Sequence, residues 1–283
     1  MTPHAPLVSL LVAAYNEERQ IAACLRALLA QTWQPLEILV VDDGSTDRTR
    51  ELAAAFDGVR VLRQEHVGKA RAMNWGAREA RGELIFFMDA DIEYAPDYVA
   101  RMVAPILAGD CLGTCHGTEL VANPENPWAA CWQLCAGLPV AVRLRVAPAQ
   151  LAQGSRVYRA LRREEFLRVG GFDDTGFLDD QTLYPKLGHL PAKWVIEAVC
   201  HHHNADRLAE VYTAGRWNAK SLAHLHGRRV LLRFMPPFSL LRAIRAAWHH
   251  RRWALLPYVL VNEWGIWLGA WQFCFGRSRH FGK

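Results

Sequence analysis

The sequence predicts an α/β fold: a mostly parallel, Rossmann-like sheet flanked by helices, followed by an amphipathic or hydrophobic helical segment. Two observations support this prediction. Short apolar runs bounded by turn residues alternate with stretches of about ten to fifteen residues that have helical periodicity, as in chains that build a parallel sheet. From residue 226 onwards the pattern changes to a basic, tryptophan-rich and apolar segment. We therefore expect two parts, residues 1–225 and residues 226–283.

The first two predicted strands each end on polar side chains. The run LVSLLVAA leads to Tyr15, and apolar residues at helical spacing then predict a helix over residues 17–30. The run LEILVV leads to Asp43, after which Gly44 supplies a turn and one of residues 45–47 is expected to cap the next helix. Because ligands of open α/β sheets bind at the carboxyl ends of the strands, both Tyr15 and Asp43 are candidate site residues.

The next two predicted strands also lead to charged side chains. The run VRVLRQE is followed by Lys69 and Arg71. The continuous apolar run over residues 84–88 is typical of a parallel strand covered on both faces, and it ends on Asp89 and Asp91. Two carboxylates at this edge could hold a divalent cation or a polar ligand. An isolated Asp-x-Asp is also ordinary turn chemistry, so the interpretation depends on the rest of the chain.

Composition limits the class of protein. A chain of 283 residues with 51% hydrophobic and 22% charged residues is long enough for one sizeable α/β domain and an appendage. Residues 7–14 lack a basic leader and a cleavage site, so we interpret them as a strand and expect no signal peptide. The seven cysteines include the pairs Cys111/Cys115 and Cys131/Cys135, which lack the two-residue spacing of zinc knuckles. We expect reduced thiols and a cytoplasmic protein.

The positive charge of the chain is concentrated after residue 226. Residues 226–283 hold ten Lys and Arg against one acid, Glu263, so this segment carries +9 and the remainder −4. It also holds five of the eleven tryptophans. Arginine interleaved with Trp and Leu suits an anionic membrane surface, whereas a nucleic-acid surface would need less aliphatic bulk. The alternative is a buried helix pair that covers the domain, and whether the segment spans or lies on a bilayer stays open.

Two other enzyme classes on this architecture do not fit. A dinucleotide-binding dehydrogenase needs Gly-x-Gly-x-x-Gly after the first strand, and here that turn reads Ala-Tyr-Asn-Glu. An aspartate-dependent phosphatase needs its Asp-x-Asp after the first strand, and here the pair follows the fourth. Both classes are therefore excluded.

Residues 7–225 resemble the family 2 glycosyltransferases of GT-A fold. The resemblance rests on an ordered set of blocks, each weak alone: VAAYNEE, VVDDGSTD, GKARAMNWGAREARGELIFFMDAD, RVGGFDD, LDDQTLYPKL and GRW. It implies that Tyr15 stacks on the nucleotide base, that Asp43 accepts from a base N–H and that Asp89 faces the ribose. It further implies that Asp91 binds Mn²⁺ or Mg²⁺. The other residues implied to line the nucleotide pocket are Ala13, Glu17, and Lys69 or Arg71.

The same resemblance implies a general base. Asp180 occupies the family's base position, and Asp179 stands where this family usually has Glu. Such a base fits the chemistry, because an acceptor hydroxyl must lose its proton as it attacks the sugar. On spacing alone, Asp180 could equally cap a helix over residues 181–187.

Two further features are weaker. Arg216 and Trp217 match the end of the Gln-x-x-Arg-Trp motif of processive synthases, so we place them on the acceptor side. Thr213 stands at the Gln position of that motif, so we expect an enzyme that adds a single sugar. Of three consecutive histidines, His202 is our candidate metal ligand, although solvated histidines at a strand end are an alternative.

These observations together predict an inverting, metal-dependent glycosyltransferase. We expect a nucleotide-diphosphate sugar as donor, a UDP-sugar first, and a hydroxyl acceptor that is lipid-linked or part of a cell-envelope glycan. We expect the enzyme on the cytoplasmic face of an anionic membrane, with no nucleic-acid partner. The alternative from another class is a catalytically silent nucleotide-sugar sensor or scaffold at the membrane.

Overall fold

The computed structural model describes residues 5–175 and 178–275. Its contacts divide the chain into two compact units, which we call the sheet unit and the helical unit. The sheet unit comprises Met1–Leu120, Leu144–Asp174 and Asp179–His202, and the helical unit comprises Val121–Arg143, Thr175–Leu178 and His203–Lys283. The expected boundary between residues 225 and 226 falls near the end of helix α9 (Leu208–His226), inside the helical unit.

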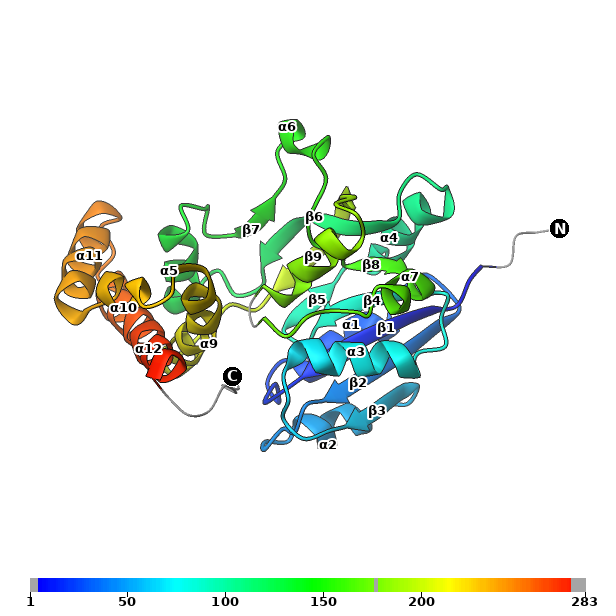
Figure 1. Ribbon diagram of the computed structural model, residues 1–283, viewed down its shortest axis with the longest axis horizontal. Helices are drawn as coiled ribbons and strands as arrows, with labels where there is room; N and C mark the ends of the chain where they lie inside the picture. The colour runs from blue at the N-terminus through cyan, green and yellow to red at the C-terminus, as the bar shows by residue number, and fades with distance from the viewer. Residues whose placement is uncertain (1–4, 176–177, 276–283) are drawn as a thin grey trace. The chain divides into compact units, whose positions relative to one another are not determined.

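Four strands form the parallel half of the sheet, as the sequence predicted (Figure 1). Strand β1 pairs in parallel with β2 and β4, and β2 pairs in parallel with β3. The register sets Ala13 opposite Asp89 and Ala14 opposite Asp42, so these strands end at one edge. Their bounds are β1 (Val8–Ala14), β2 (Leu36–Asp42), β3 (Val59–Arg63) and β4 (Leu84–Asp89).

The other half of the sheet is antiparallel where its pairing is described. Strand β8 joins β4 to β6, and β9 joins β6 to β5, which gives the order β3-β2-β1-β4-β8-β6-β9-β5, with β7 paired to β6. The short β5 brings the residues after Asp89 against the end of β9. These strands are β5 (Ile92–Tyr94), β6 (Gly113–Val121), β7 (Val142–Arg145), β8 (Ala160–Arg162) and β9 (Lys193–His202).

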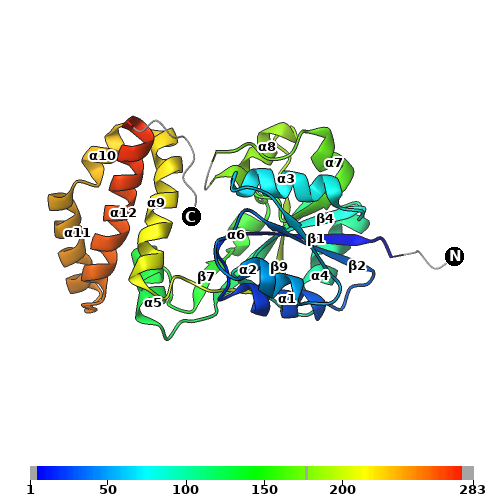
Figure 2. The same cartoon turned by 90° about the horizontal axis from the view of Figure 1, so that it is seen from below.

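Helices cover both faces of the sheet (Figure 2). Because successive side chains of a strand point to opposite faces, Leu10 belongs to one apolar cluster and Leu11 to the other. The first cluster lies under α1 (Ile21–Leu29), α2 (Thr49–Ala54) and α4 (Tyr98–Leu107). The second lies under α3 (Lys69–Glu79), α7 (Arg163–Arg168) and α8 (Leu183–Lys186). A one-turn helix, α6 (Pro148–Leu151), lies in the connection between β7 and β8.

The first helix begins later than predicted, at Ile21 instead of residue 17. The backbone N–H groups of residues 16–18 donate to Ser45 Oγ, Thr49 Oγ1 and an Asp47 oxygen, respectively. Asn16 also has a positive φ of 56°, which a helix does not allow. These residues therefore form a loop at the strand edge.

The helical unit is built around α9 and α12 (Leu255–Phe275), which pack through small residues. A Cβ added to Gly265 would lie 2.4 Å from the carbonyl oxygen of Tyr212, and one added to Gly215 would lie 2.4 Å from that of Asn262. Glu263 is buried and forms an ion pair with Arg242. The remaining helices are α5 (Pro127–Cys135), α10 (Arg229–Arg233) and α11 (Pro236–His249).

The length and apolarity of the described helices decide whether any of them could span a bilayer. Among residues 5–175 and 178–275, none combines the length and apolarity that crossing a membrane requires. Helix α12 packs on α9 and α11 within the helical unit, and eight of its residues, Glu263 and Gly265 among them, are buried.

Candidate active site

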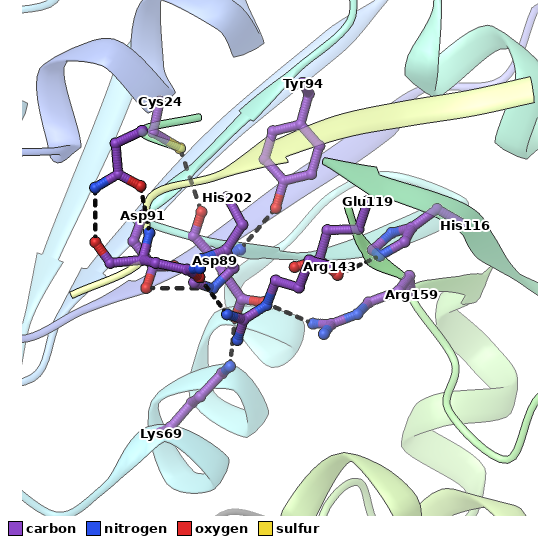
Figure 3. Close-up of polar contacts among 12 residues, drawn as sticks. Cys24, Lys69, Asp89, Asp91, Tyr94, His116, Glu119, Arg143, Arg159 and His202 are labelled. Carbon is purple, nitrogen blue, oxygen red and sulfur yellow. Dashed lines mark hydrogen bonds and ion pairs between the residues drawn. The ribbon is translucent and has the colours of Figure 1, made fainter. Parts of the chain in front are cut away.

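Asp89, the last residue of β4, lies at the centre of an ion-pair network (Figure 3). Lys69, the first residue of α3, contacts one carboxylate oxygen, and Nη1 of Arg159 lies 2.9 Å from the other. The backbone N–H of Asp89 donates to the hydroxyl of Tyr94 at 2.9 Å. Both carboxylate oxygens of Asp89 therefore face cationic groups of the chain itself.

The Asp89 carboxylate stabilises both cations of this network, Lys69 and Arg159, and they stabilise it. Burial alone would raise the pKa of Asp89, but Lys69 and Arg159 outweigh burial and hold it far below its usual range. Burial alone would lower the pKa of Lys69 and of Arg159, but Asp89 outweighs it and raises both. Asp179 also raises the pKa of Lys69 and Asp180 that of Arg159, so several carboxylates share these two positive charges.

Asp91 and His202 form a second carboxylate-centred pair beside the first (Figure 3). Antiparallel pairing of β5 with β9 sets His202 opposite Ile92, and Nε2 of His202 lies 3.6 Å from an Asp91 oxygen. Ligands bound about 2.1 Å from one ion lie about 3 to 4 Å apart, and carboxylate oxygen with imidazole nitrogen is a donor set that Mn²⁺ accepts. The pair thus fits the metal that the resemblance implies.

Tyr15 and Asp43 meet at a third point of the edge, around His66. The Tyr15 ring stacks on the His66 ring with centroids 4.0 Å apart. Nδ1 of His66 lies 2.8 Å from an Asp43 oxygen, and both oxygens of this buried carboxylate also accept backbone N–H groups, from Val67 and Gly68. Asp43 thereby fixes the loop between β3 and α3, and Tyr15 keeps one ring face on His66.

A glycine at position 44 allows the loop between β3 and α3 to approach Asp43. Its φ is +79°, and an added Cβ would lie 2.8 Å from the backbone nitrogen of His66. Any side chain here would push the loop away from Asp43.

Asp179 and Asp180 begin a short 3₁₀ helix, η1 (Asp179–Thr182). Oδ2 of Asp180 lies 4.0 Å from Nη2 of Arg159, so this guanidinium lies between Asp180 and Asp89. Asp180 lies inside η1 and does not cap a helix over residues 181–187, because α8 begins only at Leu183. Asp179 and Asp180 therefore lie next to the strand edge that ends on Asp89.

Asp179 differs from Asp180 in its surroundings. Asp179 is 7% exposed, whereas the side chain of Asp180 is 27% exposed. Burial raises the pKa of Asp179 to about 6; Lys69 opposes this shift and the neighbouring Asp180 adds to it. Asp180 is therefore the more solvent-accessible of the two carboxylates.

Asn74 of α3 holds the loop that leads to η1. Its side chain donates to the carbonyl of Phe172 and accepts from the N–H of the same residue, both at 2.9 Å. Gly171 has φ +71°, and an added Cβ would lie 2.3 Å from Oδ1 of Asn74. The helix that presents Lys69 thus also anchors the segment before Asp180.

The remaining predicted residues have different places. Ala13 and Glu17 lie at the end of β1 and just beyond it, and the N–H of Glu17 donates to Thr49 Oγ1 at 2.7 Å. Arg71 has a half-exposed side chain, and its Nε lies 3.7 Å from a carboxylate oxygen of Asp174. Arg216 and Trp217 lie on α9 of the helical unit, where Arg216 donates to Gln272 at 3.0 Å.

Sequence reasoning missed three residues of this site: His66, Asn74 and Arg159. His66 and Asn74 lie in or beside the block that contains Lys69, so polar residues there were available candidates. Arg159 lies just before the three-residue strand β8, outside the quoted blocks. Only the tertiary structure brings its guanidinium to both Asp89 and Asp180.

The side chains of the network fill most of the space between α3 and η1. The cavity among them has a volume of about 10 Å³, smaller than a water molecule needs for free movement. By contrast, a cavity of about 360 Å³ in the helical unit has a mostly apolar lining, which includes Phe234, Leu260 and Trp264.

A half-parallel α/β sheet with carboxylates at its strand edge is the arrangement that the resemblance to the family 2 glycosyltransferases implies. The comparisons agree, since residues 9–168 match the family described as Glycosyl transferase family 2. The chain belongs to this family, as the sequence predicted.

Named relatives and solved structures support the assignment. The chain is 32% identical to a validoxylamine A glucosyltransferase of Streptomyces hygroscopicus subsp. limoneus over 61% of this chain and 45% of the relative. It is 32% identical to the beta-monoglucosyldiacylglycerol synthase of a Nostoc species over 69% and 43%. The chain thus spans less than half the length of these relatives.

Among solved structures, the chain resembles the mannosyltransferase PcManGT of Pyrobaculum calidifontis in complex with GDP-Man and Mn²⁺, with a TM-score of 0.57 and 21% identity over 94% of this chain and 88% of the other. At this identity the likeness shows the fold alone, and it confirms the predicted GT-A architecture.

Proposed function

We propose that this chain is an inverting, metal-dependent glycosyltransferase that moves a sugar from a nucleoside diphosphate sugar to an acceptor hydroxyl. One observation carries the proposal: Asp89, Asp91 and His202 gather at one strand edge, and Arg159 connects that edge to Asp180. The neighbour solved with GDP-Man and Mn²⁺, and the Staphylococcus aureus protein TarS solved with UDP-GlcNAc at a TM-score of 0.52, support a donor of this class. A UDP-sugar is the donor we expect first.

The donor would bind along the strand edge. Tyr15 presents a ring for the nucleotide base, Asp43 would accept from a base N–H, and Asp89 would face the ribose. In the unliganded network Asp89 holds Lys69 and Arg159, so ribose binding would share or displace these partners. The remaining residues of the proposed nucleotide pocket are Ala13, Glu17, and Lys69 or Arg71.

Asp91 and His202 would hold Mn²⁺ or Mg²⁺, which, when bound, neutralises the negative charge that develops on the leaving diphosphate. Lys69 adds a fixed positive charge near the same place. In the reaction, the acceptor oxygen forms a bond to the anomeric carbon as the bond from that carbon to the phosphate oxygen breaks. Because attack comes from the opposite face, the anomeric configuration inverts.

Asp180 would take the proton that the acceptor hydroxyl loses. Its side chain is part-exposed, and Arg159 lies 4.0 Å away, so the carboxylate is oriented without being enclosed. Asp179 and, on α9, Arg216 and Trp217 would serve the acceptor side. We expect a single addition per acceptor, because Thr213 stands where the motif of processive synthases has Gln.

The acceptor we propose is a lipid-linked hydroxyl or a cell-envelope glycan at the cytoplasmic face of a membrane. The name of the Nostoc relative, beta-monoglucosyldiacylglycerol synthase, supports a lipid acceptor for this part of the family. The excess of arginine after residue 226 supports an anionic surface.

The test is turnover of matched variants. Released nucleoside diphosphate would be measured for the parent, Asp180→Asn and Asp179→Asn with a panel of nucleotide sugars and Mn²⁺. Asp180→Asn should keep donor affinity and lose about a hundredfold or more in rate, since proton abstraction acts only in the transition state. A larger loss in Asp179→Asn would transfer the role of base to Asp179, and tight binding without any turnover would favour the silent sensor.

A further inference from the structure

Helix α11 (Pro236–His249) has an inverted amphipathic pattern. The side that packs inward carries small residues, with Ser239, Ala243 and Ala247 buried. The outward side carries large apolar ones: Leu241 is 66% exposed and Trp248 is 79% exposed. The other exposed apolar side chains of this helix are Phe238, Leu240 and Ile244.

These exposed side chains share one face. Residues three or four positions apart are neighbours on a helix surface, so Leu241, Ile244 and Trp248 form a continuous stripe that begins at Phe238. Three buried residues at spacings of four lie on the opposite side. Trp253, just after the helix, is 75% exposed. A stripe of this kind on a soluble helix marks a surface that contacts another apolar phase or partner.

The charges around the stripe have one sign. No acidic residue occurs from residue 227 to residue 262, and seven arginines do. Arg242 pairs with Glu263, whereas Arg245, Arg251 and Arg252 have exposed side chains beside or just beyond the stripe. An anionic surface is therefore the electrostatic complement of this face.

We propose that the α11 face, defined as Phe238, Leu240, Leu241, Ile244 and Trp248, docks into the interface of a bilayer that contains anionic phospholipid. The apolar side chains enter the boundary between headgroups and acyl chains, and the neighbouring guanidinium groups contact lipid phosphates. This inference rests on the proposed function, in which a lipid-linked acceptor is presented at a membrane. It narrows the predicted membrane contact from the whole segment after residue 226 to one face of one helix.

Charge and length favour this occupant over two others. A two-fold contact with a second copy of the chain would bring the same patch against itself, so arginines would face arginines. A spanning helix needs about 20 apolar residues, and α11 has 14. The face therefore lies on the bilayer.

The experiment is co-sedimentation of the full chain with vesicles of phosphatidylcholine alone or with added phosphatidylglycerol. The parent should bind the anionic vesicles at least tenfold more tightly than the neutral ones. A double variant, Leu241→Ser with Trp248→Ser, should lose at least tenfold in affinity, and its melting temperature should stay that of the parent because both side chains are exposed. The matched control is Leu190→Ser, whose exposed leucine lies in the sheet unit and should leave vesicle binding unchanged.

A second pair of variants tests the charge. Arg245→Gln with Arg251→Gln and Arg252→Gln should lose the preference for anionic vesicles, whereas Arg50→Gln, an exposed arginine of the sheet unit, should keep it. Three outcomes would overturn the proposal: a parent that ignores both vesicle types, a serine double variant that binds like its control, or a parent that is a dimer in solution and becomes monomeric in the double variant. Binding of a nucleotide without vesicles tests the proposed function separately, so failure of one does not imply failure of the other.

Discussion

At the scale of single residues, the main feature is a mostly buried arginine shared by two carboxylates. Arg159 is 17% exposed in its side chain and faces both Asp89 and Asp180, so it connects the donor edge to the proposed base. Removing one partner of a buried ion pair leaves the other charge uncompensated. The resulting loss of folding free energy is larger than the net stabilisation that the intact pair provides.

Arg159→Gln should therefore lower the free energy of unfolding by about 3 kcal/mol or more. It should also slow nucleotide-sugar turnover, because Asp180 loses its orienting group. The matched control is Arg71→Gln, whose half-exposed side chain makes only a 3.7 Å ion pair and should cost less than about 1 kcal/mol. Denaturant unfolding of both variants checks this, and equal losses would show that Arg159 has no special structural role.

Asp179 gives the protein a pH dependence of defined sign. Its pKa is about 6 in the folded protein and 3.8 as the reference value, so the folded state holds the proton more tightly. This group stabilises the fold less as pH rises from about 4 through 6, and the difference amounts to about 3 kcal/mol above pH 6. Asp179→Asn should thus be more stable relative to the parent at pH 8 than at pH 4.5. Unfolding without nucleotide or metal measures this, and a stability difference independent of pH would contradict the assignment.

At the scale of elements, the sequence predicted one half of the sheet better than the other. Strands β1, β2 and β4 are mostly apolar runs because helices cover both of their faces, and such runs are visible in the sequence. Strand β6 reads GTCHGTELV and buries His116 and Glu119, so no simple apolar pattern marks it. The site divides in the same way: carboxylates at the ends of β2 and β4 were predictable, but Arg159 was not, because its partners are distant in sequence.

The packing of α9 on α12 is the element-scale feature most open to a test. Gly265→Ala should destabilise the helical unit by about 1–3 kcal/mol, because the new methyl would overlap the carbonyl of Tyr212. Trp271→Phe, at an exposed position of the same helix, is the control and should change little. Thermal unfolding compares them, and a Gly265→Ala variant as stable as the parent would mean that the two helices are further apart than described.

At the scale of the whole molecule, the chain combines a sheet unit that carries the candidate chemistry with a helical unit that carries the proposed membrane face. The sequence predicted that the entire basic segment, residues 226–283, contacts a membrane. Since α12 packs on α9 and α11, deleting that segment would also expose apolar surface of α9. Substitutions on the exposed face of α11 therefore separate membrane binding from folding, and truncation does not.

We propose that Asp91 and His202 hold a metal through which the strand edge binds a nucleoside diphosphate. The most direct measurement is the melting temperature of the parent, Asp91→Asn and Asp180→Asn with UDP, GDP, ADP, CDP and dTDP, each with Mn²⁺ or with a chelator. Ligands that bind the folded state raise the melting temperature. We predict that at least one diphosphate raises it in the parent and in Asp180→Asn only with Mn²⁺, and that Asp91→Asn loses this effect. The claim would be contradicted if Asp91→Asn responded to nucleotide and Mn²⁺ as strongly as the parent.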